Sequence, residues 1–392
     1  MYNVTMRGFV LGLVLFLLTA LPSYAQTACM QGDANNDKKV TLTDFAVWRS
    51  VFLSGGGVTP TSGVTPTSTQ PQPLSRLRWN GKDSYVNGVN VPWYVYPYAA
   101  GHGDFGGGAT DGIISHKSIF ATEFAKLKDA NVSMVRWWMF ADGSWQINRD
   151  GSGMPTSMNP AVYADLDVAL ELAETYDLYY NLVLFSSASA FPASWRTDPA
   201  HRQKLAAVLG EMFAKYKDNP RIVSWELYNE PEWEIWNNLN GVTEEDTRAM
   251  ARELIKSIRT NSPKKLVTVG QALIDGFNVN QRGIEMWTDI DLDYHSPHWY
   301  DGQRSPADIC AICTTAQVLQ TKFNTNKPIV IGEYQQGSGT TAENLARQNE
   351  WYNRGYAGAW GWSLFADRTN DKLPVDISAL KQFSQQHPDV GP

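Results

Sequence analysis

Eight strand-like segments alternate with helical segments across residues 86–364, and this alternation predicts an α/β fold of the (β/α)8 barrel class, known as the TIM barrel. Two glutamates support it, because Glu230 and Glu333 each end a short apolar run, and the strand ends of a parallel barrel meet at one face. The length of 392 residues fits a barrel of about 250 residues or more with small additions. We therefore expect one large domain over residues 75–392.

The expected strands are short apolar runs bounded by polar or turn-forming residues. They cover Val86–Val91, Ser133–Phe140, Leu178–Phe185, Ile222–Asn229, Lys265–Gly270, Leu292–His295, Pro328–Glu333 and Ala359–Leu364. The expected helices have apolar residues three or four apart and include Ile119–Ala130, Pro160–Tyr176, His201–Tyr216, Glu244–Thr260, Ala307–Phe323 and Thr341–Arg354. Asp275–Trp287 has poor helical periodicity, so we expect irregular structure there.

The first 25 residues have the features of an export signal. Arg7 supplies positive charge, Phe9–Leu21 form an apolar run, and Ser23–Ala25 resemble a small-residue cleavage site. This run is shorter than the roughly 20 residues that a membrane span requires, and no other stretch qualifies. We expect cleavage after Ala25 and a secreted or cell-surface protein without a transmembrane span. Lipid attachment at Cys29 is the alternative.

Residues 26–53 contain a pattern typical of a calcium-binding loop followed by a helix. The residues at loop positions 1, 3, 5, 7, 9 and 12 are Asp33, Asn35, Asp37, Lys39, Thr41 and Asp44. Oxygen ligands alternate in such a loop because it curls around the ion, and Lys39 would offer its carbonyl. The segment resembles half of a dockerin, although Lys38 replaces the usual glycine. Only one repeat is visible, so we expect structural Ca²⁺ and doubt a cohesin-like partner; a solvated acidic turn is the alternative.

Residues 54–74 form a linker, because this Gly-, Ser-, Thr- and Pro-rich stretch has too little apolar surface to offset the entropy of ordering. The formal net charge is −7, and the sequence has no basic patch of the kind that binds nucleic acid. No glycine-rich phosphate loop follows a strand, so no cofactor is expected for catalysis. Cys310 and Cys313 suit a local disulfide better than a zinc site, because no second cysteine pair exists.

The glutamates that end the fourth and seventh expected strands can flank one bond at the carboxyl face of the barrel. That arrangement suits glycoside hydrolysis, in which one carboxyl group acts as acid and base and the other attacks the sugar. Glu226 lies four residues deeper than Glu230, so we expect it to pair with a buried cation such as Arg136. Glu232 and Glu234 follow in a loop. We expect their charged side chains to be solvated, and a contact with the sugar is the alternative.

The sequence Asn229-Glu230-Pro231, together with Glu333, resembles clan A glycoside hydrolases, and it is most similar to the cellulase and mannanase group called family 5. The resemblance covers about 300 residues. It implies that Glu230 is the acid/base, that Asn229 binds the sugar 2-hydroxyl, and that Glu333 is the nucleophile. Arg136 resembles an arginine that keeps the nucleophile ionised.

Two more elements fit the same family. His298-Trp299-Tyr300 resembles a His-x-Tyr element whose hydroxyl contacts the nucleophile, and Trp362 resembles a sugar platform on the eighth strand. The family commonly has a histidine near the end of the third strand, where this chain has Leu184–Ser187. Because of this departure, the choice among glucan, mannan and xylan stays open.

The remaining candidates follow the first and second expected strands. Trp93 and Asp104 are expected to line the cleft and contact substrate, whereas Trp137, Trp138 and Trp145 are favoured as scaffold. Together these features predict an exported, retaining endo-β-glycosidase acting on a β-1,4-linked polysaccharide, glucan or mannan. The alternative is a non-catalytic carbohydrate-binding or cell-surface scaffold protein with a barrel fold, although both carboxylates are present.

Overall fold

The structure is a computed structural model, and the residues that it describes belong to one unit of the chain, Gln70–Pro392. The described residues are 75–96, 102–140, 145–185, 191–276, 282–300, 309–368, 372–388 and 390. The predicted export signal, calcium loop and linker, including Asp33, Asn35, Asp37, Lys39, Thr41 and Asp44, lie outside these residues. None of the helices in the described ranges is long and apolar enough to cross a membrane.

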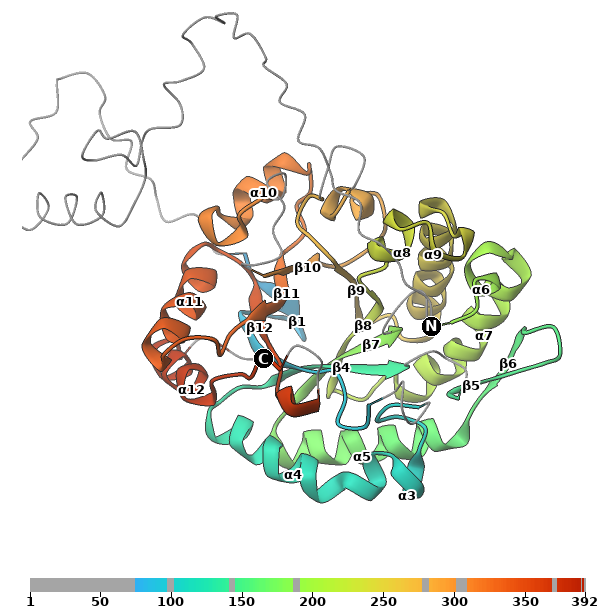
Figure 1. Cartoon of the computed structure of the whole chain (residues 1–392), viewed down its shortest axis with the longest axis horizontal. Coiled ribbons are helices and arrows are strands. Elements are labelled where there is room, and N and C mark those ends of the chain that lie inside the picture. The colour runs from blue at the N-terminus through green and yellow to red at the C-terminus, as the bar shows by residue number, and fades with distance from the viewer. Residues whose placement is uncertain are drawn as a thin grey trace, which may run out of the picture. The chain divides into compact units, whose positions relative to one another are not determined.

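Eight parallel strands close into a barrel with helices around it, which confirms the predicted (β/α)8 class (Figure 1). Each strand pairs with its neighbours in chain order, and the last pairs with the first. The strands are β3 (Val86–Val91), β4 (Met134–Phe140), β7 (Tyr179–Phe185), β8 (Ile222–Asn229), β9 (Leu266–Gln271), β10 (Ser296–Trp299), β11 (Val330–Gln335) and β12 (Gly358–Trp362).

Local sequence signals start most of the outer helices. Asn159 and Asp198 cap two of them, each followed by proline at the first helical position, and Thr243 and Thr340 form capping boxes. The longer helices are α4 (Ile113–Asp129), α5 (Pro160–Tyr176), α7 (Pro199–Tyr216), α9 (Glu244–Asn261), α10 (Ala316–Lys322), α11 (Thr341–Asn353) and α12 (Ile377–Gln386). Short helices are α3 (Gly108–Asp111), α6 (Ser194–Thr197), α8 (Glu232–Trp236), η2 (Leu239–Gly241), η3 (Ile284–Trp287), η4 (Ala311–Cys313) and η5 (Ala366–Arg368).

Two hairpins accompany the barrel. The first, β1 (Leu77–Trp79) with β2 (Lys82–Ser84), packs its buried Leu77 and Trp79 against the amino-terminal starts of the barrel strands. The second, β5 (Ile147–Arg149) with β6 (Pro155–Met158), lies between β4 and α5. The first hairpin therefore closes the end of the barrel opposite the strands' carboxyl termini.

The sixth strand differs most from the prediction. The apolar Leu292–His295 run was expected to form it, but the strand is Ser296–Trp299, which contains Pro297 and His298. Leu292 and Tyr294 are buried apolar residues, and for this reason their segment was predicted to be a strand. They lie in the segment that precedes the barrel strand, where His295 makes an isolated β-bridge. The strand Ser296–Trp299 was not predicted because some of its residues are polar and face the interior of the barrel, so it lacks the apolar run expected of a buried parallel strand.

The helix before β11 is shorter than the sequence predicted. The helix expected at Ala307–Phe323 starts only at Ala316, because Thr315 caps it, and the predicted Cys310–Cys313 disulfide holds a separate turn before it. The described part of the expected irregular segment contains only the 3-10 turn η3, in agreement with the prediction.

Strand periodicity decides which side chains face the barrel axis. On β4, Val135, Trp137 and Met139 belong to the main apolar cluster under the helices, and Trp137 packs on Phe120 of α4. Because alternate residues point to opposite faces, Arg136 and Trp138 point inward. The sequence thereby places a guanidinium inside the barrel.

Candidate active site

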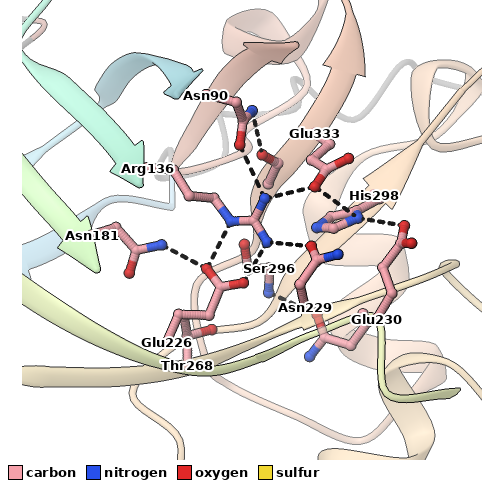
Figure 2. Close-up of polar contacts among 12 residues, drawn as sticks. Asn90, Arg136, Asn181, Glu226, Asn229, Glu230, Thr268, Ser296, His298 and Glu333 are labelled. Atoms are coloured by element: carbon pink, nitrogen blue, oxygen red, sulfur yellow. Dashed lines mark hydrogen bonds and ion pairs between the residues drawn. The ribbon is translucent and has the colours of Figure 1, made fainter. Parts of the chain in front are cut away.

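Arg136 is fully buried and connects most of the polar groups inside the barrel (Figure 2). Its Nε donates to Glu226 Oε2 at 2.8 Å and its Nη2 to Glu226 Oε1 at 2.5 Å. Nη1 donates to Glu333 Oε1 at 2.6 Å, and Nη2 also donates to Asn229 Oδ1 at 2.8 Å. The predicted pairing of Glu226 with Arg136 is confirmed, and one cation serves two buried carboxylates.

Two asparagines complete this network, and the sequence reasoning missed both. Asn90 of β3 accepts from Arg136 Nη1 at 3.0 Å, and Asn181 of β7 donates to Glu226 Oε2 at 2.6 Å. Both side chains are fully buried. An amide side chain inside an otherwise apolar strand run is the signal that could have found them, because a buried polar side chain needs a partner.

Glu333 lies on β11, two residues before the strand ends at Gln335, and has three polar neighbours. Arg136 bonds Oε1, Tyr300 Oη donates to Oε2 at 2.8 Å, and His298 Nδ1 lies 3.5 Å from Oε1. The contact predicted for the Tyr300 hydroxyl is therefore present. Burial raises the pKa of Glu333, and His298 and Arg136 oppose that rise. Because the cation bonds Glu333 directly, Glu333 is the carboxyl group of the pair that is better held as an anion.

Glu230 follows β8 with a positive φ of 51°, a left-handed conformation that is uncommon for a residue with a side chain. Its N–H donates to Gly270 O of β9 at 2.8 Å, which holds the backbone at this point. His298 Nδ1 lies 2.7 Å from Glu230 Oε1. Burial raises the pKa of Glu230 to about 7, although Trp233 and Arg136 lower it. Glu230 therefore suits a proton donor near neutral pH.

The two carboxyl groups lie close together on either side of His298, as Figure 2 shows. Single ligand atoms of Glu230, His298 and Glu333 all lie within 4.8 Å of one another. A metal ion could use these atoms, but the guanidinium already supplies positive charge to Glu333. Burial lowers the pKa of His298 to about 4, so this imidazole is neutral at pH 6 to 7 and carries no competing charge.

An aromatic group lies next to this pair. Trp362 of β12 packs edge-on against Trp138 at 5.4 Å between ring centroids, and the ring of Trp93 also packs edge-on against Trp138 at 6.3 Å. Trp138 also stacks on the Arg136 guanidinium at 4.3 Å. Tyr300 packs against the same cluster. This aromatic group is therefore joined to the carboxylate network through Arg136, on which Trp138 stacks, and through Tyr300, which bonds Glu333.

Asp104 differs from its expected place on the cleft wall. Its side chain is only 1% exposed and accepts from the backbone N–H groups of Tyr94 and Val95 and from Trp137 Nε1 at 2.8 Å. These bonds fasten the segment after β3 to β4. Asp104 therefore has a scaffold position instead of an open one.

Glu232 and Glu234 are also buried, so the expectation of solvated loop charge is wrong for both. Glu232 accepts from Ala272 N at 3.0 Å and from Trp287 Nε1 at 2.9 Å. Glu234 pairs with Arg196 Nη2 at 2.8 Å. Local sequence could not show this, because the partners lie on three other elements.

A parallel eight-stranded barrel with two neighbouring carboxyl groups at strand ends has the fold and site of a glycoside hydrolase. The chain is an enzyme of this class, and its family is shown by comparison with known proteins. Residues 108–368 match the family model described as cellulase, glycosyl hydrolase family 5, and the chain belongs to that family.

Curated relatives are similar over most of their length. A protein of Mytilus edulis named mannan endo-1,4-beta-mannosidase is 24% identical over 343 residues, covering 76% of this chain and 89% of that protein. One of Cryptopygus antarcticus with the same name is 23% identical, covering 74% of this chain and 83% of that protein.

Solved structures agree on the fold. The blue mussel β-mannanase has a TM-score of 0.64 at 20% identity, covering 81% of this chain and 96% of that one. The β-1,4-mannanase of the sea hare Aplysia kurodai has a TM-score of 0.63 at 21% identity, covering 79% of this chain and 95% of that one. At these identities the likeness shows the barrel fold.

Proposed function

We propose that this enzyme is an endo-acting, retaining β-1,4-mannanase with Glu333 as nucleophile and Glu230 as acid/base. The observation that carries the proposal is the carboxylate pair whose ligand atoms lie within 4.8 Å, with Arg136 bonded to Glu333 alone of the two. Retaining enzymes need carboxyl groups about 5 to 5.5 Å apart, whereas inverting enzymes need about 6.5 to 9.5 Å to leave room for water. The short separation supports double displacement.

In the first step, Glu333 attacks the anomeric carbon while the bond to the leaving oxygen breaks and Glu230 donates its proton to that oxygen. A glycosyl ester on Glu333 results. In the second step, Glu230 as a carboxylate takes a proton from water, which displaces Glu333 from the sugar. We infer that Asn229, which accepts a hydrogen bond from Arg136, binds the neighbouring 2-hydroxyl, and that the contacts of His298 and Tyr300 orient the two carboxyl groups.

Mannan is favoured over glucan and xylan because the two relatives described above, which match over 89% and 83% of their own length, are named mannan endo-1,4-beta-mannosidases. The aromatic group of Trp93, Trp138 and Trp362 supports a polymeric sugar substrate, since flat rings stack on the apolar faces of pyranose rings. A hydrolysis screen on β-1,4-mannan, cellulose and xylan tests the preference. Release of internal fragments with rapid loss of viscosity would support endo action.

The catalytic roles are tested by Glu333→Gln and Glu230→Ala, with Glu174→Gln as a matched control on an exposed glutamate. We expect mannan hydrolysis to fall at least about 10⁴-fold for Glu333→Gln, because no covalent intermediate can form. Azide should rescue Glu230→Ala on an activated aryl mannoside and give a β-mannosyl azide. Full activity of Glu333→Gln would refute the assignment of the nucleophile, whereas a parent protein that hydrolyses none of these polysaccharides would favour the non-catalytic scaffold alternative.

We also propose that the mature chain is secreted and begins near Gln26, with a calcium-binding half-module on residues 26–53 and a linker on residues 54–74. The support is the sequence pattern alone. Calorimetric titration of the mature chain with Ca²⁺ should show a site that Asp33→Ala abolishes, and EDTA should leave mannan hydrolysis unchanged. Absence of binding heat would refute the calcium site, and a cohesin-like partner would then have no basis.

A further inference from the structure

Each oxygen of the Glu230 carboxyl group has its own nitrogen partner. His298 Nδ1 lies 2.7 Å from Oε1, and the indole Nε1 of Trp233 donates to Oε2 at 3.0 Å. Trp233 lies on α8, three residues after Glu230, and its ring is only partly buried. An indole N–H can donate but cannot accept, so this bond is strongest when Oε2 carries no proton.

The short helix α8 is held on both sides by buried carboxyl groups. On one side Glu232 is bound by Ala272 N, just after β9, and by Trp287 Nε1 of η3. On the other, Glu234 is bound by Arg196 of α6. Residues two apart on a helix point in nearly opposite directions, so these contacts fix the rotation of α8 and hence the position of Trp233 between them.

The segment after β8 is therefore joined to β9 twice. Glu230 N–H donates to Gly270 O at 2.8 Å, and Ala272 N–H donates to the Glu232 side chain at 3.0 Å. These bonds lie on both sides of the left-handed residue Glu230. A one-turn helix has little stability of its own, so its geometry comes from these contacts.

We propose that Trp233 is a positioning residue for the acid/base, in which the indole N–H fixes the orientation of the Glu230 carboxyl group and stabilises its base form. The inference rests on the proposed function, because it assumes that Glu230 transfers the proton. An oriented carboxyl group donates efficiently to the leaving oxygen in the first step, and a stabilised carboxylate is ready to accept the proton of water in the second.

Other charged and titratable groups face Glu230 from every element around it. They are Arg136 of β4, Glu226 of β8, Glu232 of α8, His298 of β10 and Glu333 of β11. A change of Trp233 to phenylalanine alters none of these charges. It removes only a donor that favours the carboxylate, so the pKa of Glu230 should rise from its value of about 7.

The test compares Trp233→Phe with the parent over a pH series on mannohexaose. The alkaline limb of kcat/KM should move up by about one pH unit, because that limb reports the acid in the free enzyme. At pH 6, kcat/KM on mannohexaose should fall about tenfold through poorer alignment. On 2,4-dinitrophenyl β-mannotrioside kcat/KM should stay unchanged, because that leaving group needs no proton. Trp236→Phe, on the same helix, is the matched control and should not move the limb.

If Trp233→Phe does not fold, β-(3-benzothienyl)alanine at position 233 keeps the ring shape and replaces only the N–H by sulfur. An alkaline limb and a substrate ratio equal to the parent's in the folded variant would overturn the inference. Glu230→Ala separates this failure from that of the proposed function. If Glu230→Ala keeps mannan activity, the proposed function fails and the inference with it; if it loses activity and Trp233→Phe matches the parent, only the role of Trp233 fails.

Discussion

Replacing Arg136 by methionine would remove the cation on which two buried carboxylates depend. Glu226 and Glu333 have side chains 0% and 6% exposed, so water cannot replace the guanidinium. Removing one partner of a buried ion pair typically costs about 3–5 kcal/mol. Glu226 keeps its bond from Asn181 and Glu333 keeps its bond from Tyr300. Because two carboxylates lose their cation but each keeps one hydrogen bond, we expect a loss within that range, about 3–5 kcal/mol, against a total stability of about 5–15 kcal/mol.

The loss should depend on pH, and Glu333 sets the sign. Burial raises the pKa of Glu333 in the folded protein above its unfolded value, and removal of Arg136 would raise it further. A carboxyl group whose pKa is higher in the folded state than in the unfolded state makes the folded state bind more protons. The resulting loss of stability is absent below about pH 4, and it grows as the pH rises towards the pKa of Glu333 in the folded state. The variant should therefore be closer to the parent at pH 5 than at pH 7.

Urea unfolding at pH 5 and pH 7 measures these differences. Arg221→Met is the matched control, because Arg221 also has two carboxylate partners, Glu174 and Asp177, but their side chains are 70% and 68% exposed. It should cost less than about 1 kcal/mol. Adding Glu226→Gln to Arg136→Met should recover about 2 kcal/mol by removing an unpaired buried charge. Equal losses for the two arginines, or no gain in the double variant, would refute the reasoning.

Three further predictions concern single groups. The kcat/KM for mannan should decline above about pH 7, because burial raises the pKa of Glu230 to about 7 and only the protonated acid can donate; a plateau to pH 9 would contradict this. Gly270→Ala should lower kcat about 100-fold in steady-state assays with native circular dichroism, because its Cβ would lie 2.7 Å from Arg136 Nη2; near-parental kcat would show that the network tolerates it. Asp165→Asn should cost about 1–3 kcal/mol in urea unfolding, because the buried carboxylate accepts hydrogen bonds from three backbone N–H groups of the segment 106–114, which includes α3 and the start of α4. An unchanged unfolding midpoint would contradict that anchoring role.

Much of the barrel could be predicted because most of its strands are mainly apolar and its helices carry local start signals. Val86–Val91 and Ile222–Asn229 were predicted with the bounds that the structure has. Ser296–Trp299 was missed because an inward polar residue and a proline break the apolar run, and burial decided the strand instead of local propensity.

The site was predictable where strand ends bring carboxylates together, as for Glu230 and Glu333, and where parity turns Arg136 inward. The burial of three acidic residues could not be predicted, namely Asp104, Glu232 and Glu234. The local sequence around an acidic residue in a loop does not show whether it is solvated or bound by N–H groups from distant elements. Trp233 was missed for the same reason: its bond to Glu230 depends on how α8 is held. Long-range partners, absent from local sequence, decide these roles.

The anchoring of α8 has a consequence for protein engineering. Barrel enzymes are commonly altered by exchanging one loop for the equivalent loop of a relative, on the assumption that each loop is an independent module. Here residues 231–241 carry the carboxyl groups that Arg196, Ala272 and Trp287 bind. Exchanging that loop alone would leave the buried Arg196 without its carboxylate partner and would remove the contacts that hold the segment after Glu230 in place. A transferable unit would have to combine this loop with α6, the end of β9 and η3.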